Sequence, residues 1–302
     1  MDRNLHSFVK VSIVHFMAFP EVQGGEGPIV ETLQHIANDD FFQMVEITSV
    51  NSPEVRRQVA DLLKASRLEV AFGAQPVLLR GKHDLNAADA EVRKAAVNAV
   101  KGAIDEAAEI GARRVGILSG RNVPAEERPA AMERLADSLT QLCAYGRERG
   151  VSVVLETFDH DIDKKALVGP TPEAVALAQQ IRREYPDFGL MLDLSHLPLQ
   201  GESTWDALRT AQPVLVHAHI GNCVVRDPQH PLYGDKHPPF GVPGGENDVD
   251  EVAEFLRALL EIGYLKDGAP GAVGFEVVPH GQDPIATIQG SKRVLQRAWA
   301  IA

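Results

Sequence analysis

The chain has 302 residues, of which 44% are hydrophobic, so it can bury a sizeable core as one large α/β barrel or as two smaller domains. Its 30 Lys and Arg against 42 Asp and Glu give a formal net charge of −12 at pH 7, which disfavours binding to nucleic acid or to an anionic membrane. The two cysteines form no C-x-x-C pair, and the chain shows neither a signal-peptide pattern nor a long apolar segment. We therefore expect a cytoplasmic protein without a disulfide framework or a membrane span.

Eight apolar segments rich in Val, Ile, Leu and Phe predict β-strands, and each is followed by a segment with helical periodicity. In chain order, the expected strands are residues 11–19, 44–50, 68–74, 114–120, 151–158, 188–196, 214–221 and 272–279. The expected helices are residues 27–38, 52–65, 88–110, 126–149, 171–184, 203–211, 248–262 and 284–300. Ser52 and Thr171 each precede a proline and are expected N-caps, and Gly111 is expected to end a helix in the left-handed conformation.

Strict alternation of strands and helices predicts a parallel sheet. Eight repeats in a chain of this length fit a single (β/α)8 barrel, the TIM barrel of the α/β class, over residues 1–302. An open dinucleotide-binding sheet is disfavoured, because no G-x-G-x-x-G follows the first strand and the glycines of QGGEGP have other spacings. The longest interruption is a loop at about residues 221–247, and long loops inside compact domains are usually functional.

Polar residues end four consecutive expected strands: Glu156, Asp193, His219 and Glu276. In a barrel, the carboxyl ends of the strands form the active face, so these side chains are expected to converge. Three carboxylates would repel one another there, and a divalent cation relieves that repulsion. We therefore predict one metal ion, with Mn²⁺ preferred and Mg²⁺, Co²⁺ or Zn²⁺ as alternatives. A single carboxylate at a strand end is commonly a helix cap or a solvated loop residue, but four on consecutive strands are harder to explain in that way.

A second histidine, His217, lies two residues before His219 on the same face of the expected strand. Two histidines on one face do not comfortably reach the same ion. We therefore expect His217 to hydrogen-bond a neighbour in the core, to support the site or to contact the substrate.

The segments VLETFD, LMLDLSH, HAHIGN and GFEV resemble, in this order along the chain, the four metal-ligand segments of the xylose-isomerase-like barrel superfamily. That superfamily includes sugar isomerases, ketose 3-epimerases and inosose dehydratases. The resemblance implies that Glu156 and Glu276 are both metal ligands and the acid–base pair on opposite sides of the sugar. It also implies that His196 holds a substrate hydroxyl.

Two positions depart from the pattern of the ketose 3-epimerases. Those enzymes usually carry an arginine six residues after the ligand histidine, where this chain has Val225 and then Arg226. They also carry a second glutamate six residues after the first ligand, where this chain has Ile162. Both departures weaken the assignment to that particular reaction.

Two loops add polar residues beyond the ligand segments. ETFDHDIDKKALVG adds His160, a candidate base, and a pair of lysines. The loop at about residues 221–247 begins near Asn222 and is expected to form a lid or, alternatively, a subunit-contact arm. Its residues expected to contact a polyhydroxylated substrate are Arg226, His230, Tyr233, Lys236 and His237, together with Asn222. These loops are loosely similar to the barrel subunits of enzymes that cleave 3-keto-glycosides, including C-glycoside deglycosidases, which would imply a second subunit.

The pattern as a whole favours an enzyme that removes a proton next to the carbonyl of a small-molecule sugar and passes through an enediolate. Glu156, Glu276 and His160 are the candidate catalytic groups. Return of the proton to carbon defines an isomerase or epimerase, while expulsion of a β-substituent defines a lyase on keto-glycosides. A metal-dependent endonuclease is a rival that the acidic charge disfavours, and a sugar-binding barrel without catalysis is another. We expect a homo-oligomer, as is usual for cytoplasmic enzymes of this size.

Overall fold

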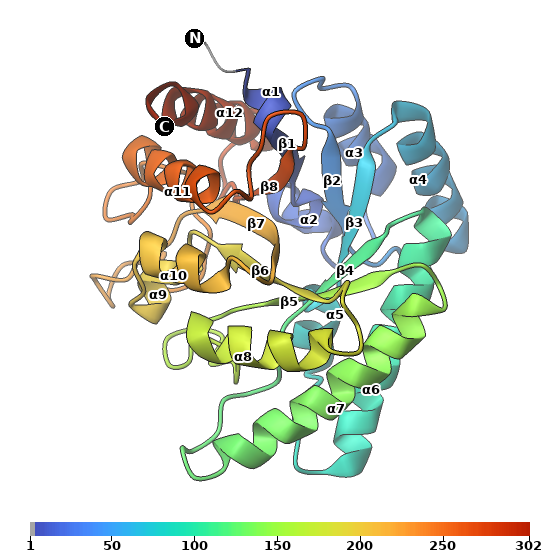
Figure 1. Ribbon diagram of the computed structural model, residues 1–302. Helices are drawn as coiled ribbons and strands as arrows, with labels where there is room; N and C mark the ends of the chain where they lie inside the picture. Colours follow the sequence, from blue (N-terminus) through green and yellow to red (C-terminus); the bar gives the residue numbers. More distant parts are fainter. Residues whose placement is uncertain (1–3) are drawn as a thin grey trace.

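The structure is a computed structural model that describes residues 4–302, and it is a barrel of eight parallel strands surrounded by helices (Figure 1). The strands are β1 Val9–Ile13, β2 Met44–Ile47, β3 Glu69–Gly73, β4 Arg114–Ile117, β5 Ser152–Glu156, β6 Gly189–Asp193, β7 Leu215–Gly221 and β8 Gly271–Glu276. From β2 to β8 each strand pairs with the next along the chain, and β8 also pairs with β1. Between β1 and β2 the ring is completed by a parallel bridge between Val14 and Glu46. The predicted (β/α)8 barrel is confirmed.

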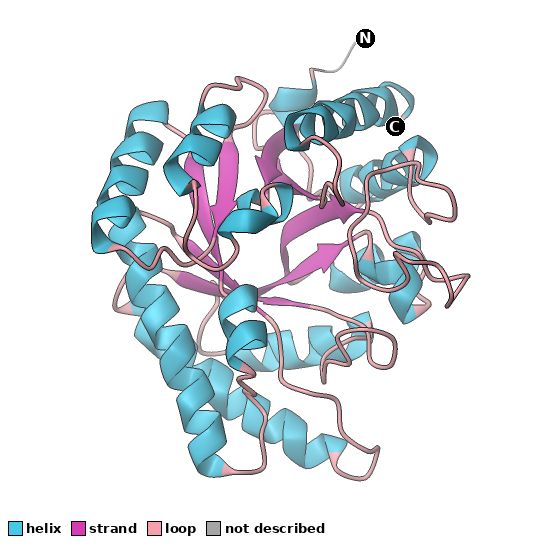
Figure 2. Ribbon diagram, turned by 180° about the vertical axis from the view of Figure 1, so that it is seen from behind, coloured by secondary structure: helices cyan, strands magenta, loops and turns pink. Residues whose placement is uncertain are grey.

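All eight expected helices are present within a few residues of their predicted bounds. They are α3 Ile29–Ala37, α4 Pro53–Ser66, α6 Ala90–Ile110, α7 Arg128–Arg147, α8 Thr171–Arg182, α10 Thr204–Ala211, α11 Val249–Glu261 and α12 Pro284–Ile301. Five short elements were not expected: α1 Leu5–Phe8, α2 His15–Ala18, η1 Pro20–Val22, α5 Gln75–Gly81 and α9 His196–Gln200. Figure 2 shows the end of the barrel at which loops and short helices lie in front of the strands.

The first expected strand, residues 11–19, was misplaced. Strand β1 ends at Ile13, and helix α2 begins two residues later, at His15. The apolar run continues past β1 because Phe16 and Ala18 remain buried within α2. A short apolar run does not by itself distinguish a strand from a buried helical turn, which explains the error.

The ends of the helices follow the expected chemistry, with one exception. Ser52 caps α4, because its Oγ accepts a hydrogen bond from the Val55 N–H at 3.4 Å. Gly111 ends α6 with φ of 93°, in the left-handed region that favours glycine. Thr171 is instead the first residue of α8, and its hydroxyl donates to Glu202 Oε2 at 2.7 Å. This bond connects the start of α8 to the loop before α10.

The core lies inside the barrel and between the strands and the outer helices. Strand β6 is buried along its whole length, as expected for a parallel strand covered on both faces. Since the strands are all parallel, their carboxyl ends meet at one end of the barrel, and the polar residues at those ends are brought together there. No helix within residues 4–302 is long and apolar enough to cross a bilayer.

Candidate metal centre and active site

The four predicted ligands lie together at the carboxyl end of the barrel. Glu156 ends β5, Asp193 ends β6, His219 lies near the end of β7 and Glu276 ends β8. The sheet register places Asp193 beside His219 on neighbouring strands. Each of the four residues offers one ligand atom, and these atoms all lie within 4.8 Å of one another.

The converging atoms are buried and lack hydrogen-bond partners. They are Glu156 Oε1, Asp193 Oδ2, His219 Nδ1 and Glu276 Oε2. His219 Nδ1 lies 2.7 Å from Glu276 Oε2 and 3.9 Å from Glu156 Oε1, without the alignment of a hydrogen bond. Unpaired buried polar atoms are costly, and three oxygens with one imidazole nitrogen suit a divalent cation such as Mn²⁺, Mg²⁺, Co²⁺ or Zn²⁺. These residues therefore fit the ion that the sequence predicts.

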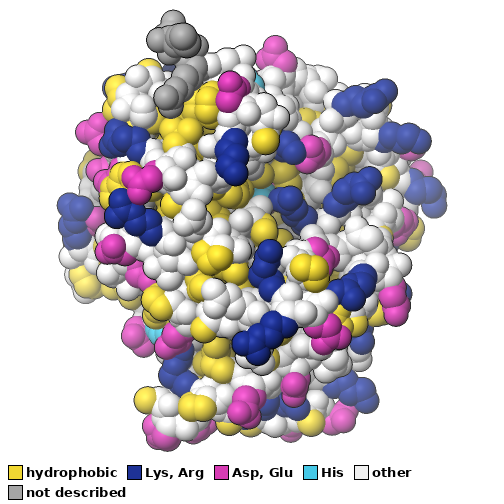
Figure 3. All heavy atoms as spheres, viewed as in Figure 1, with side chains coloured by type: hydrophobic (Ala, Val, Ile, Leu, Met, Phe, Trp, Pro, Cys, Tyr) yellow, Lys and Arg dark blue, Asp and Glu magenta, His cyan; other side chains and the backbone are white. Residues whose placement is uncertain are grey.

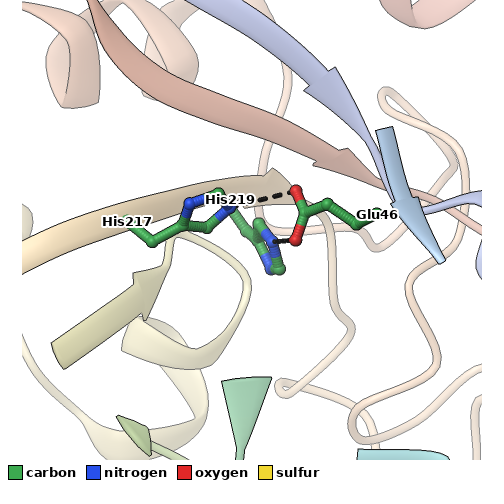
Figure 4. A group of neighbouring side chains, drawn as sticks. All are labelled: Glu46, His217 and His219. Atoms are coloured by element: carbon green, nitrogen blue, oxygen red, sulfur yellow. Dashed lines mark hydrogen bonds and ion pairs between the residues drawn. The ribbon is translucent and has the colours of Figure 1, made fainter. Parts of the chain in front are cut away.

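A carboxylate that was not predicted, Glu46 of β2, orients His219, the predicted ligand histidine (Figure 4). Its Oε2 lies 2.9 Å from His219 Nε2 and its Oε1 lies 3.0 Å from His217 Nε2. Ser12 Oγ donates a further hydrogen bond to Oε1, at 2.9 Å. With its Nε2–H donated to Glu46, His219 keeps the lone pair of Nδ1 directed at the carboxylates, which is the usual arrangement of a metal-ligating histidine. His217 is therefore hydrogen-bonded to a neighbour in the core, Glu46, which confirms one of the expectations for it.

Gly274 and Gln75 also support this arrangement, the first by leaving space and the second by a hydrogen bond. A Cβ at Gly274 of β8 would stand 2.4 Å from Glu46 Oε1, so glycine is needed where the Glu46 carboxylate crosses the barrel. Gln75, at the start of α5, donates from Nε2 to Glu156 Oε2 at 2.7 Å. This bond orients the Glu156 carboxylate and leaves its Oε1 facing the other ligands.

A second polar group adjoins the first and comes largely from the long loop after β7. Asp235 Oδ1 lies 2.7 Å from His237 Nε2 and 3.2 Å from His196 Nε2, and Asp235 Oδ2 accepts a hydrogen bond from Lys164 Nζ at 2.6 Å. His196 Nδ1 is 2.8 Å from the carbonyl oxygen of Thr157. Asp235 was not predicted, because a carboxylate in a loop carries no periodic signal.

The charges within this cluster shift several pKa values in opposite directions. Burial and the neighbouring Glu276 raise the pKa of Glu156 to about 8. Burial alone would also raise that of Glu276, but His237 and His219 outweigh it and lower its pKa to about 2. Burial disfavours the charged form of His237, yet Asp235 and Glu276 raise its pKa to about 9. Without an ion, the imidazoles of the cluster thus act as the counter-charges of its carboxylates.

A cavity of about 430 Å³ opens onto the cluster, within the range of roughly 300–1,000 Å³ that is usual for small-molecule sites. Its polar lining includes Glu156, His217, His219, Asp235, His237 and Glu276. Its apolar lining includes Phe16, Met17, Ala71, Phe72, Leu79 and Val278. Asp193 and His196 are fully buried and do not line the cavity.

In addition to Asp193 and His196, three predicted catalytic or substrate-binding residues do not line the cavity: His160, Asn222 and Arg226. His160 packs against Gly169 of its own loop, and its Nε2 lies 3.1 Å from the Leu167 carbonyl oxygen. Asn222 is buried and accepts hydrogen bonds from the backbone N–H groups of Cys223 and Asn247, so it organises the long loop instead. The Arg226 side chain is 78% exposed and forms an ion pair with Glu246. We therefore assign these three residues no contact with a substrate, because their loops fold back on themselves.

The long loop after β7 is held against the site by the loop after β5. The backbone N–H of Asp235 donates to Asp163 Oδ2 at 3.1 Å, and Lys236 Nζ lies 2.9 Å from the same oxygen. The carbonyl of His237 accepts from the Val278 N–H at 2.7 Å, just beyond β8. His237, with φ of 47°, is thereby turned into the cluster. These contacts hold the loop against the cluster, and its role as a lid stays a prediction.

Comparisons with known proteins agree with this architecture. No curated protein matches the chain significantly. Among solved structures, it resembles the IolI protein with a bound zinc atom, with a TM-score of 0.74, 17% identity and coverage of 96% of this chain and 98% of the other. It also resembles an L-ribulose 3-epimerase, with a TM-score of 0.70, 19% identity and coverage of 96% and 95%. The 3-keto-D-glucoside 4-epimerase YcjR of E. coli has a TM-score of 0.66, 17% identity and coverage of 95% and 99%.

At these identities, the solved structures establish a shared fold. The match to a family goes further, because it covers residues 37–298, which is most of the chain. The chain belongs to the xylose isomerase-like TIM barrel family.

Proposed function

We propose that this protein is a divalent-metal-dependent isomerase or epimerase of a keto-sugar, with Glu156, Asp193, His219 and Glu276 as the metal ligands. The observation that carries the proposal is the convergence of four buried, unpaired ligand atoms beside a cavity. Membership of the family and the names of the similar solved structures, which include sugar epimerases and a protein with bound zinc, support it. When bound, Mn²⁺ or a similar ion supplies positive charge that stabilises the oxygens of an enediolate.

Two of the proposed ligands are also placed to move protons. Glu156 and Glu276 are the carboxylates of the ligand group that line the cavity, so a sugar bound there contacts both. One carboxylate removes the proton from the carbon next to the carbonyl, and the other returns a proton to carbon. Gln75 orients Glu156, and His237 Nε2 lies 3.5 Å from Glu276 Oε1.

Hydroxyl groups of the sugar find partners on the side of the cavity that Glu156 and Glu276 line. His217 and His237 line it, as does Lys236 from the long loop. The apolar residues on the opposite side exclude water, which strengthens the electrostatic interactions within the site. We propose His217 and His237 as the substrate-binding histidines, in place of His196, which does not line the cavity.

A solvent-exchange experiment tests the reaction. The Mn²⁺-loaded protein is incubated in D₂O with a panel of free ketoses and 3-keto-glycosides, and spectra are recorded by NMR after the metal is removed with a chelator. Deuterium on the α-carbon of a rearranged sugar is the expected result, and Glu156→Gln is expected to slow that exchange at least about hundredfold. Absence of exchange with every sugar, or exchange that Glu156→Gln does not affect, would overturn the proposal.

A second candidate function is elimination from a 3-keto-glycoside, which the apolar side of the cavity favours because it can hold a leaving group. Release of the aglycone in the same NMR experiment identifies that reaction.

An endonuclease is the weaker alternative. The net charge is −12, and Figure 3 shows Lys and Arg side chains interspersed with Asp and Glu on one face of the molecule. A low-salt gel-shift experiment is expected to show no DNA binding.

A further inference from the structure

Two crossed ion pairs join the loop after β5 to the loop after β7 at the edge of the cavity. Lys164 Nζ donates to Asp235 Oδ2 at 2.6 Å, and Lys236 Nζ lies 2.9 Å from Asp163 Oδ2. Gly234 lets the loops approach, because its φ is 92° and a Cβ there would stand 2.7 Å from Asp163 Oδ2. We call Asp163, Lys164, Asp235 and Lys236 the loop clasp.

The backbone of Lys164 is fixed independently of the clasp. The carboxylate of Asp159, which is buried, accepts hydrogen bonds from three consecutive backbone N–H groups. These belong to Ile162 at 2.5 Å, Asp163 at 2.8 Å and Lys164 at 2.8 Å. Side-chain bonds of this kind hold a loop in one conformation, so the Lys164 side chain enters the cavity from a rigid base.

The ammonium of Lys164 has more donors than the clasp uses. An ammonium carries three N–H groups. Within residues 4–302, the hydrogen-bond acceptors of Lys164 Nζ are both on Asp235, namely Oδ2 at 2.6 Å and the carbonyl oxygen at 3.4 Å. The Lys164 side chain is 19% exposed and lines the cavity, so at least one N–H is left for a group bound there.

The two lysines of the clasp stand in different surroundings. The Lys236 side chain is 46% exposed and that of its partner Asp163 is 21% exposed, so water competes for both groups. Asp235, the partner of Lys164, is 1% exposed. Burial alone would lower the pKa of Lys164, but Asp235 outweighs it and raises that pKa, so the group stays an ammonium. A hydrogen bond from a charged donor in such a water-poor place is stronger than one at the surface.

We propose that Lys164 is a substrate-contacting residue that donates a hydrogen bond to a hydroxyl oxygen of the sugar. The inference rests on the proposed function for the presence of a sugar, and it adds the group that recognises one of its hydroxyls. Asp235 and Glu276 also line the cavity and would repel an anionic group, so an uncharged hydroxyl is the matching partner. The clasp holds the ammonium in place before the sugar arrives, so little side-chain freedom is lost on binding.

Sugars that lack single hydroxyls test this contact. D-Fructose, D-tagatose and their monodeoxy analogues are titrated into protein loaded with diamagnetic Mg²⁺, and affinities are measured by ligand-observed NMR. The wild type is expected to bind one analogue about tenfold more weakly than its parent sugar. Lys164→Met is expected to bind the parent about tenfold more weakly than the wild type does, and to bind parent and analogue within about twofold of each other.

Two control variants separate contact from loop stability. Lys165→Met changes the next residue, which is exposed and does not line the cavity, and it should leave every affinity unchanged. Asp163→Ala breaks the other ion pair of the clasp and spares the Lys164 ammonium. Loosening the loops in this way should weaken parent and analogue by the same factor, because it acts on no single hydroxyl. If Lys164→Met does not fold, Lys164→Gln replaces it, since its amide still donates to Asp235.

Equal affinity of the wild type for the parents and all analogues, discrimination that the Lys164 variant retains, or no binding of either parent sugar would overturn the inference. The deuterium-exchange experiment is scored separately. If exchange occurs while the Lys164 variant keeps the wild-type discrimination, the contact fails and the proposed function stands. If the discrimination depends on Lys164 but no sugar exchanges, the proposed function fails and the contact stands.

Discussion

The two sides of the cavity differ in what their strands bring to the mouth of the same barrel. Strands β5 to β8 end in three carboxylates and a proposed ligand histidine, His219, whose converging buried atoms lack partners. Strands β1 and β3 lead into short helices with apolar side chains. The same parallel strand pairing holds both sides of the cavity in place. The residues at the strand ends, and not the sheet, therefore decide what each side can bind.

Two buried histidines show a related contrast, between a site without carboxylates and one with them. Burial lowers the pKa of His15, in α2, to about 3, so it stays neutral. His237, which is equally buried on the polar side, has its pKa raised to about 9, because Asp235 and Glu276 outweigh burial. Burial by itself opposes charge, and only nearby carboxylates reverse that effect.

Removing one carboxylate from the polar side should have the largest effect. Asp193→Asn is expected to weaken Mn²⁺ binding at least about hundredfold, because it replaces one of four ligands. Burial disfavours the charged form of Asp193 and raises the pKa of that carboxyl, so the neutral amide removes this cost, and the metal-free variant should melt at a higher temperature than the metal-free wild type.

Calorimetric titration and thermal melts with and without Mn²⁺ measure both effects. Asp61→Asn, at an exposed position on α4, is the matched control and should change neither. Unchanged Mn²⁺ affinity in Asp193→Asn would mean that the four residues are a hydrogen-bonded network and not a metal centre.

Glu46 connects the two sides, since it extends from β2 to the histidines of β7. Glu46→Gln leaves one acceptor for two imidazoles, so the orientation of His219 is lost in part. We expect Mn²⁺ affinity to fall about thirtyfold, within the range for residues that orient a ligand. Histidine ¹⁵N chemical shifts should also show an altered tautomer of His219, which a purely structural defect would not produce. Glu69→Gln, at the exposed start of β3, is the control. Full affinity with an unchanged tautomer would refute this role.

His15 of α2, which is buried outside the cavity, predicts a pH dependence of stability. Between about pH 6.5 and pH 3, the unfolded chain binds a proton that folded His15 does not, so stability falls as the pH falls. Relative to His15→Gln, the wild type should lose about 2 kcal/mol more unfolding free energy between pH 7 and pH 5. Urea unfolding at both pH values measures this difference, with the exposed His35→Gln as control. Identical losses in wild type and His15→Gln would show that His15 titrates normally in the folded protein.

The smallest effect is expected at His160, which is near the polar side in sequence but not in space. His160→Gln should leave the deuterium-exchange rate within about twofold of the wild type, because its ring is bonded to its own loop. A loss comparable to that of Glu156→Gln would extend the catalytic group beyond the cavity lining.

The barrel and its four proposed ligands could be predicted from the sequence because both depend on local patterns. Apolar runs and 3.6-residue periods alternate along the chain, and parallel strands necessarily bring their carboxyl ends to one end of a barrel. Glu156, Asp193, His219 and Glu276 could therefore be placed together from their positions at strand ends alone. The end of β1 was misplaced because its apolar run continues into a buried helix.

Tertiary structure alone decided the rest. Glu46 meets His217 and His219 across 171 and 173 residues of chain, and only closure of the barrel between β1 and β2 brings it there. The loops likewise carry no period that indicates the direction of a side chain, so Asp235 points into the cluster while His160 and Arg226 do not. Strand ends are positioned by backbone pairing that every sequence of this fold shares, whereas loop side chains are positioned by contacts that form only once the chain has folded.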